Sequence, residues 1–215
     1  MRIHLIGAGG FAREVLDIIE ACVDRGDDLA VAGIYADGGG DLDLLTARGY
    51  SMAGPVASVP RPSPEDRFVI GFGNAAARQR VDDALCHDGW VAASLVHPQA
   101  SLGSKITIGA GSVICAGARL TTNIVLGRHV HINLNTTVGH DVQLSDYVTL
   151  NPLVSVSGRV QIGPRASIGT GANINERLTV GADAVVGAGA VVVRDVDPQI
   201  TVAGVPAKPL GRRDD

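Results

Sequence analysis

Aromatic residues are scarce in this chain of 215 residues, which contains three Phe, three Tyr and one Trp. The sequence is nevertheless 46% hydrophobic and contains 28 Gly. Few rings and many small or branched apolar residues are what a narrow interior accommodates. The composition therefore favours an elongated repeat fold over a wide globular core.

Cysteine, excess positive charge and long apolar runs are also lacking. Cys22, Cys86 and Cys115 are not clustered, which excludes a disulfide framework and a cysteine-based zinc site and predicts reduced thiols. A net charge of −4 gives no basic footprint for nucleic acid or an anionic membrane. Met1–Ile6 is too short for a signal peptide, and no apolar span reaches the length of a transmembrane helix. We therefore expect a cytoplasmic protein with no nucleic-acid or membrane partner.

An aliphatic residue at every sixth position dominates the second half of the chain. The register runs without interruption through seventeen positions, and a small or β-branched residue stands two positions before most of them. Such a strict short period is typical of a β-solenoid. The aliphatic positions are Val96, Leu102, Ile108, Ile114, Leu120, Leu126, Ile132, Val138, Leu144, Leu150, Val156, Ile162, Ile168, Ile174, Val180, Val186 and Val192.

Alternation along a strand explains this pattern, because residues i and i−2 point to the same face. Three hexapeptides would close one triangular coil of 18 residues, with the aliphatic side chains inside and successive coils paired along the axis. Glycine often follows the aliphatic residue, as at Gly139 and Gly163. We expect this glycine to turn the corner with a positive φ. An α-helix is excluded, because a period of six would spread these residues around its circumference.

The N-terminal third alternates between strand and helix patterns. Strands are predicted at residues 2–6, 29–35, 68–72 and 90–96, and helices at residues 11–23 and 75–86. Four of the ten prolines lie between residues 45 and 66, which we expect to be rich in loops. The chain is therefore predicted to contain a small parallel α/β domain over residues 1–90, a Rossmann-like half domain, and a parallel β-helix with a C-terminal tail over residues 91–215.

A glycine-rich turn follows the first predicted strand. Gly7-Ala8-Gly9-Gly10-Phe11-Ala12 fits G-x-G-x-x-[GA], which directs backbone N–H groups and a helix N-terminus toward an anion, commonly a phosphate. Asp37 ends the second strand, where a carboxylate could hold a ribose or a base. About four strands make only half of a dinucleotide fold, so a nucleotide-sized ligand is favoured. The alternative is a glycine turn that merely lets strand and helix pack.

Polar residues interrupt the hexapeptide pattern mainly in one coil, between His129 and Asp141. His140 is a candidate general base, and the adjacent Asp141 could orient its ring because both follow Gly139 at a corner. His129 and His131 lack a third residue at a metal-ligand spacing, so no metal is expected. The alternative for a single surface histidine is a solvated side chain.

The whole chain resembles the sugar O- and N-acetyltransferases of the sialic acid O-acetyltransferase and bacillosamine-pathway family, which are hexapeptide-repeat acyltransferases. The resemblance rests on the hexapeptide run, the glycine turn, the segment from Asn133 to Asp141 and the closing Ala203-Gly204-Val205-Pro206-Ala207-Lys208. It implies a left-handed parallel β-helix, assembly as a homotrimer, acetyl-CoA as co-substrate in a groove between two chains, and a nucleotide-linked sugar held by the N-terminal domain.

The resemblance also assigns roles to individual positions. His140 falls on the catalytic base and Asp141 on the acid that raises its basicity. Acetyl-CoA positions fall on Thr149, Gly158, Thr170 and Ala188, with Gly158 beside the thioester. Substrate positions fall on Gly9, Gly10, Phe11, Asp37, Gly73 and Asn133.

Two positions depart from the family pattern. Phe11 stands where some members have a histidine, and Ala36 stands where a second Asp often precedes the residue matching Asp37. The expected activity is acetyl transfer to the amine of a nucleotide-linked amino sugar. O-acetylation of a sialic acid or another free sugar remains an alternative, as does a non-catalytic solenoid that binds nucleotide or supports assembly.

Overall fold

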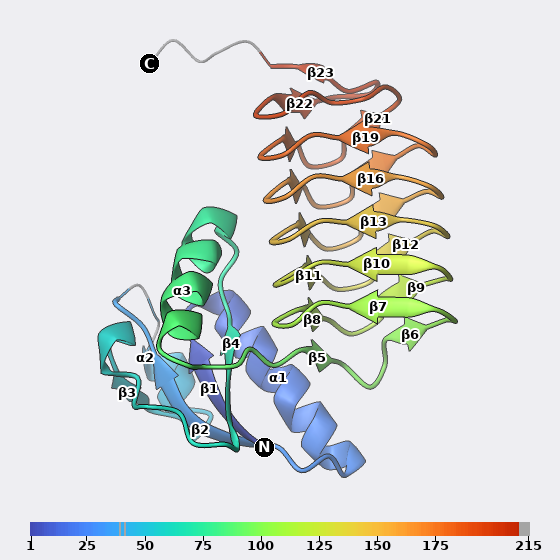
Figure 1. Ribbon diagram of the computed structural model, residues 1–215. Coiled ribbons are helices and arrows are strands. Elements are labelled where there is room, and N and C mark those ends of the chain that lie inside the picture. Colours follow the sequence, from blue (N-terminus) through green and yellow to red (C-terminus); the bar gives the residue numbers. More distant parts are fainter. Residues whose placement is uncertain (39, 41, 211–215) are drawn as a thin grey trace. The chain divides into compact units, whose positions relative to one another are not determined.

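The computed structural model describes residues 1–38, 40 and 42–210. The chain divides into two compact units, the first spanning Met1–Pro98 and the second beginning at Gln99 (Figure 1). Within the described residues, no helix combines the length and the apolar character needed to cross a bilayer.

The first unit is a four-stranded parallel sheet with helices. The sheet order is β3-β2-β1-β4. Its elements are β1 (Arg2–Ile6), α1 (Gly10–Arg25), β2 (Ala30–Tyr35), α2 (Leu42–Thr46), β3 (Met52–Gly54), a 3-10 turn (Val56–Ser58), β4 (Asp66–Ile70), α3 (Ala75–His87) and β5 (Leu95–Val96).

Burial of apolar side chains explains this arrangement. Leu5 in the central strand β1 and Phe68 in β4 are fully buried, as are Val15 and Leu16 on the inner face of α1. The heptad-like spacing of the apolar residues in α1 therefore corresponds to one buried helix face. Gly26 ends the helix in the left-handed conformation, as a C-terminal glycine commonly does.

The strand predicted over residues 90–96 is mostly wrong. Only Leu95–Val96 forms a strand, and Ala92 makes a single parallel bridge to Phe68. The fourth strand of the sheet is instead β3, which lies in the proline-rich segment that was expected to be rich in loops. Its three residues, which end with Gly54 and are followed by Pro55, are too few to leave a periodic signal.

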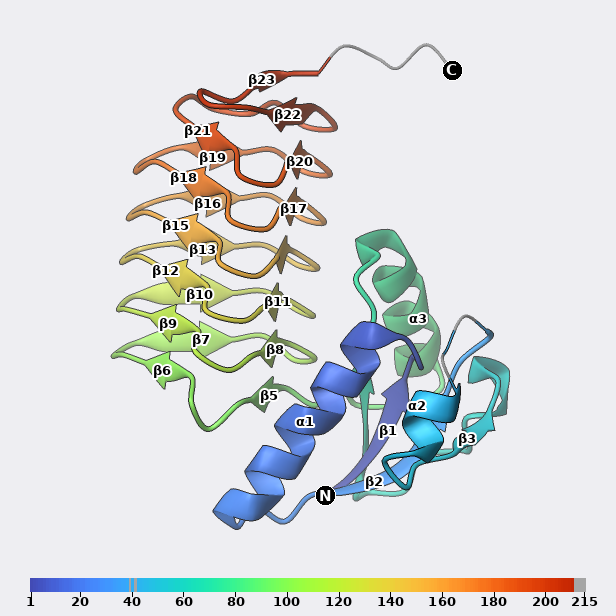
Figure 2. The ribbon, with the colours of Figure 1, turned by 180° about the vertical axis from the view of Figure 1, so that it is seen from behind.

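The second unit is a parallel β-helix whose strands form three sheets (Figure 2). The first sheet contains β7 (Ile106–Ile108), β10 (Ile124–Leu126), β13 (Gln143–Leu144), β16 (Gln161–Ile162) and β19 (Thr179–Val180). The second contains β8 (Val113–Ile114), β11 (His131–Ile132), β14 (Thr149–Leu150), β17 (Ser167–Ile168), β20 (Val185–Val186), β22 (Thr201–Ala203) and the antiparallel β23 (Lys208–Pro209). The third contains β6 (Ser101–Leu102), β9 (Arg119–Leu120), β12 (Thr137–Val138), β15 (Ser155–Val156), β18 (Asn173–Ile174) and β21 (Val191–Val192).

The strand register confirms a coil of 18 residues. Ile132 pairs with Leu150, and Val138 pairs with Val156, so each residue lies against the one a single coil further along. Every aliphatic position from Ile114 to Val192 is buried, as the sixfold period predicts. Of the three earlier positions, Val96 and Ile108 are half-buried and Leu102 is 37% exposed. Leu102 and Ile108 lie in β6 and β7, each of which is the terminal strand of its sheet. The fold is the predicted α/β domain followed by a left-handed β-helix.

The expected role of the corner glycines is wrong. Positive φ occurs three residues after the aliphatic position, for example at Asn123 (54°), Asp141 (61°) and Arg159 (61°), and not at the glycine directly after it. A Cβ on Gly139 would lie 2.8 Å from the backbone nitrogen of Gly158 in the next coil. These glycines therefore permit close stacking of coils rather than an unusual backbone angle.

Candidate active site

His140 and Asp141 form a hydrogen-bonded pair at a corner of the β-helix. Nδ1 of His140 lies 2.8 Å from Oδ2 of Asp141. Adjacent residues on a strand would point to opposite faces, but this pair lies beyond the end of β12, and the left-handed backbone at Asp141 turns its carboxylate back toward the ring. The two side chains are 55% and 38% exposed, so the pair is open to a ligand.

The Asp141 carboxylate has partners on both oxygens. In addition to His140, Asn123 donates from Nδ2 to Oδ1 at 3.1 Å, and Nε of Arg159 lies 3.6 Å from Oδ2. The hydrogen bonds from His140 and then Asn123 hold the pKa of Asp141 below its usual value. An ionised carboxylate can only accept hydrogen bonds, so the neutral form of the His140 ring that fits this contact has its proton at Nδ1 and its lone pair at Nε2.

Gly158 covers the other side of the ring. A Cβ on this residue would lie 2.6 Å from Nε2 of His140 and 2.7 Å from its Cε1. Only glycine leaves room for the imidazole here, so the predicted neighbours His140 and Gly158 do meet. The site therefore combines an oriented imidazole with the adjacent half-buried backbone of Gly158.

The other predicted acetyl-CoA positions lie elsewhere on the helix. Thr170 and Ala188 are exposed and follow β17 and β20 in the second sheet, whereas His140 and Gly158 follow β12 and β15 in the third. Thr149 is buried in β14. One chain therefore does not bring these positions together with His140.

Asn133 and the remaining histidines of this coil are buried. Asn133 donates from Nδ2 to the carbonyl of Leu150 at 2.9 Å, which commits that amide to the fold. His129 stacks on Tyr147 at a centroid distance of 5.7 Å. Across the described part of the chain, His, Cys, Asp and Glu do not gather in groups of three that would suit a metal ion.

The loops that follow β1, β2 and β4 meet at the carboxyl edge of the sheet in the first unit. A Cβ on Gly7 would lie 3.0 Å from the carbonyl oxygen of Gly71, and one on Gly40 would lie 2.6 Å from Cβ of Ala8. Gly7 has a φ of 119°, so both conformation and space require glycine. Gly9 caps α1 and Gly10 begins it, followed by the half-buried Phe11. The predicted turn from strand to helix is therefore present.

Gly73 lies beyond β4 and is held by a buried arginine. Nη1 of Arg78 donates to the carbonyl oxygen of Gly73 at 2.7 Å and to that of Phe72 at 3.2 Å. Arg78 is fully buried in α3. Asn74 caps the same helix by accepting from the Ala77 N–H at 2.8 Å. These bonds fix the backbone of the loop between β4 and α3.

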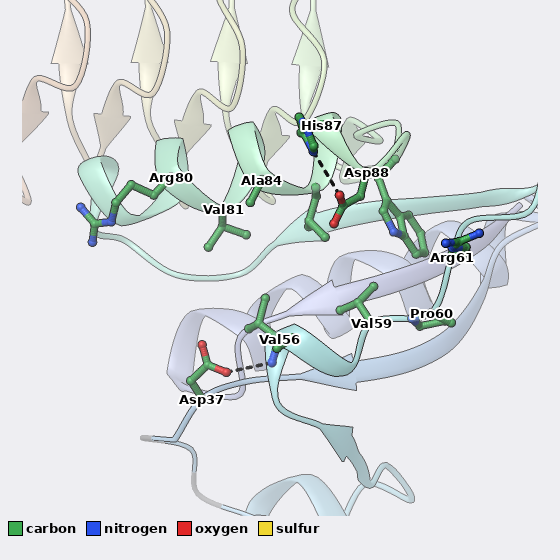
Figure 3. A pocket seen from close by; sticks show the side chains of 13 residues that line it. Asp37, Val56, Val59, Pro60, Arg61, Arg80, Val81, Ala84, His87 and Asp88 are labelled. Carbon is green, nitrogen blue, oxygen red and sulfur yellow. Dashed lines mark hydrogen bonds and ion pairs between the residues drawn. The ribbon is translucent and has the colours of Figure 1, made fainter.

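Asp37 lines a cavity of about 800 Å³ within the first unit (Figure 3). Its Oδ1 accepts a hydrogen bond from the backbone N–H of Val56 at 2.8 Å. None of the other predicted substrate positions lines this cavity. The lining residues are Asp37, Val56, Ala57, Val59, Pro60, Arg61, Arg80, Val81, Ala84, Leu85, His87, Asp88 and Trp90.

Comparison with known proteins identifies the family. The PglD N-terminal domain family matches residues 2–85. Perosamine N-acetyltransferase from Caulobacter crescentus, whose structure was solved with CoA and GDP-perosamine, is 30% identical with a TM-score of 0.88, covering 98% of this chain and 97% of that one. The chain belongs to the PglD-like family of sugar N-acetyltransferases. The predicted family resemblance is confirmed.

Two further members support this assignment. The acetyltransferase domain of PglB from Neisseria gonorrhoeae FA1090, in complex with acetyl coenzyme A, is 32% identical to this PglD-like chain with a TM-score of 0.85, over 97% of this chain and 98% of that domain. GDP-perosamine N-acetyltransferase from Escherichia coli O157:H7 is 32% identical over 147 residues. That match covers 66% of this chain and 63% of the length of the relative.

Sequence reasoning missed several residues of these sites. Asn123 and Arg159 contact Asp141 from the coils on either side, at a spacing of 18 residues that aligned repeats would have revealed. Arg61 and Arg80 line the cavity in the first unit, and no sequence pattern marks them.

Proposed function

We propose that this protein transfers an acetyl group from acetyl-CoA to the amine of a nucleotide-linked amino sugar. The observation that carries the proposal is the contact between Nδ1 of His140 and Asp141, which leaves Nε2 beside Gly158 on an exposed corner. The similarity to N-acetyltransferases crystallised with CoA and with a nucleotide amino sugar supports the same reaction class.

His140 acts as the general base in this proposal. Its Nε2 takes a proton from the acceptor amine while the nitrogen forms a bond to the acetyl carbonyl carbon. The carbon–sulfur bond then breaks, the thiolate of CoA leaves, and the proton on His140 passes to that thiolate or to solvent. Asp141 stabilises the protonated ring, and a backbone N–H near Gly158 is assigned to the carbonyl oxygen as it gains negative charge.

A homotrimer is part of the proposal, because the assigned acetyl-CoA positions lie on two different corners of one chain. His140 and Gly158 occupy one corner, and Thr170 and Ala188 occupy another. Two parallel copies side by side could juxtapose these corners and form a groove between them. The small exposed side chain of Ala188 leaves backbone accessible for an extended pantetheine arm.

The first unit is assigned to the nucleotide. The cavity has apolar walls that include Val59, Val81 and Trp90, which suit the face of a base, while Arg61 and Arg80 supply positive charge for phosphate. Asp37 is assigned to the ribose or base, and the turn at Gly9, Gly10 and Phe11, with Gly73, to the remainder of the acceptor. Cys22, Cys86 and Cys115 are not joined in disulfides, in keeping with the proposed cytoplasmic location.

Acetyl transfer to a panel of acceptors tests the function. The panel contains nucleotide-linked amino sugars with purine and pyrimidine bases, the corresponding free amino sugars, and sialic acid, with release of CoA thiol as the readout. We expect transfer to at least one nucleotide-linked amine and at least 100-fold lower kcat/KM for its free sugar. Preferential O-acetylation of a free sugar, or no transfer to any acceptor, would contradict the proposal.

A further inference from the structure

One corner of the β-helix carries a column of polar residues that includes Asp141. These residues follow successive strands of the third sheet at intervals of 18 residues and all have a left-handed backbone. Asp141 is the acid of this column, with an amide in the coil before it and a guanidinium in the coil after it. The column consists of Lys105, Asn123, Asp141, Arg159 and Arg177.

The backbone ladder holds the members of this column in register. The Asp141 N–H donates to the carbonyl of Thr122 at 3.0 Å, and the Arg159 N–H donates to the carbonyl of His140 at 2.8 Å. Each side chain therefore starts from a fixed Cα position. The freedom that remains for the Asp141 carboxylate is rotation about its own side-chain bonds, which is broad for an aspartate.

Asn123 restricts that rotation. Its Nδ2 lies 3.1 Å from Oδ1 of Asp141, while the other carboxylate oxygen, Oδ2, faces Nδ1 of His140 at 2.8 Å. Arg159 is less well placed, at 3.6 Å from Oδ2 with its side chain 58% exposed. The amide of Asn123 is therefore the contact that holds the carboxylate in the orientation that presents one oxygen to the histidine.

We propose that Asn123 is a positioning residue for the catalytic pair, fixing the Asp141 carboxylate so that His140 keeps its proton at Nδ1 and its lone pair at Nε2. The inference rests on the proposed function of His140 and deepens it. A purely structural role, in which the column only joins neighbouring coils, predicts a change in stability without a specific effect on turnover.

Replacing Asn123 by glycine tests the proposal, because glycine keeps the left-handed backbone and removes the amide. Lys105→Gly is the matched control, since Lys105 has a φ of 55° at the same corner, one coil before Asn123. We expect Asn123→Gly to lower kcat about 10-fold, as for loss of one hydrogen bond to a charged group. Both KM values should change less than twofold, and Lys105→Gly should retain wild-type kcat.

A double-mutant cycle tests whether Asn123 acts through Asp141. In an Asp141→Asn background, Asn123→Gly should cause less than a twofold further loss of kcat, because the group it positions is already changed. An unchanged kcat in the single variant, or equal losses in both backgrounds, would overturn the proposal. An equal loss in Lys105→Gly would also overturn it, because the effect would then come from the corner and not from the amide.

A measurement without substrate separates this inference from the proposed reaction. Nitrogen-15 NMR of the histidine rings, with His140 assigned by comparison with His140→Ala, reports which ring nitrogen carries the proton. We expect one tautomer in the wild type and a mixture in Asn123→Gly. An identical His140 spectrum in both would overturn the positioning role even if the enzyme is active, and a shifted spectrum would support it whether or not the tested acceptors react.

Discussion

The Cβ position of Gly158 lies 2.6 Å from Nε2 of His140, although the two residues are separated by a full coil. No heavy atom fits at that distance without moving the ring, and the opposing atoms belong to the imidazole itself. The identity of residue 158 therefore determines which position the imidazole of His140 can occupy.

Gly158→Ala should displace the imidazole and lower kcat by about 100-fold, because misplacement of a reacting group by about 1 Å has costs of that order. The β-helix should remain folded, since the clash is with a half-exposed side chain that can rotate outward. Steady-state kinetics measure kcat, and thermal unfolding checks the fold. A folded variant with wild-type kcat would show that His140 does not react from its observed position.

His140→Ala should lower kcat by about 10²- to 10⁴-fold, the usual contribution of a positioned general base. The affinity for acetyl-CoA should change little, because the assigned binding positions are mainly backbone groups. Kinetics with the preferred acceptor and calorimetric titration with CoA measure the two quantities. An unchanged kcat would remove His140 from the mechanism, and a loss of CoA affinity as large as the loss of kcat would make it a binding residue.

The low pKa of Asp66 predicts how the stability of the first unit depends on pH. Hydrogen bonds from the backbone and side chain of Ser63, and contacts with His4 and Arg2, lower its pKa to about 2. The unfolded value is about 3.9. The stabilisation is therefore complete above pH 4 and is lost as the pH falls from about 4 to 2.

Burial lowers the pKa of His4 in the folded protein. As the pH falls below about 6.5, the unfolded chain therefore binds a proton at this histidine more readily than the folded protein does, which also lowers the stability. Asp66→Asn should reduce the free energy of unfolding at pH 7 by about 1–3 kcal/mol and flatten its dependence between pH 4 and 2. Trp90 fluorescence reports unfolding of this unit, because Trp90 is the single tryptophan and is buried there. Asp28→Asn, at an exposed position, is the control. If the free energy of unfolding of Asp66→Asn varied between pH 4 and 2 as it does in the wild type, the pH dependence would come from other groups.

The β-helix could be predicted from the sequence because its signal is local and repeated. Each short strand buries one aliphatic residue such as Val138 or Val156, so the sixfold period fixes both the coil length and the inward face. The pairing of His140 with Asp141 was also foreseeable, because the two are adjacent at a corner.

The partners of this pair depend on stacking between coils. Asn123 is 18 residues from Asp141 and contacts it only because the ladder aligns both at left-handed corners. Lys105 and Arg159 occupy equivalent corners, so residue type alone does not mark a functional position.

Asp37 shows the same limit in the first unit. Its placement at the end of β2 was predictable, but the contact with Val56 depends on a short strand and 3-10 turn in a proline-rich segment that has no clear periodicity. The cavity around Asp37 therefore could not be read from the sequence.

Gly169 and Gly171 illustrate the two reasons for glycine in a coil, which are the close stacking of coils and a left-handed backbone. A Cβ on Gly169 would lie 2.5 Å from the backbone nitrogen of Ala188, whereas one on Gly171 would meet nothing within 4 Å but would have a φ of 68°. Gly171→Ala should therefore cost about 1 kcal/mol of stability, the strain of a left-handed alanine. Gly169→Ala should cost about 3 kcal/mol, because stacked backbone cannot move aside without separating two coils.

Gly171→Asn serves as a further control and should be closer to neutral, because asparagine tolerates this backbone region. Chemical denaturation of the three variants gives the comparison. Equal costs for Gly169→Ala and Gly171→Ala would mean that coil spacing does not select glycine after the aliphatic residue, and the repeat would then need another explanation for its glycines.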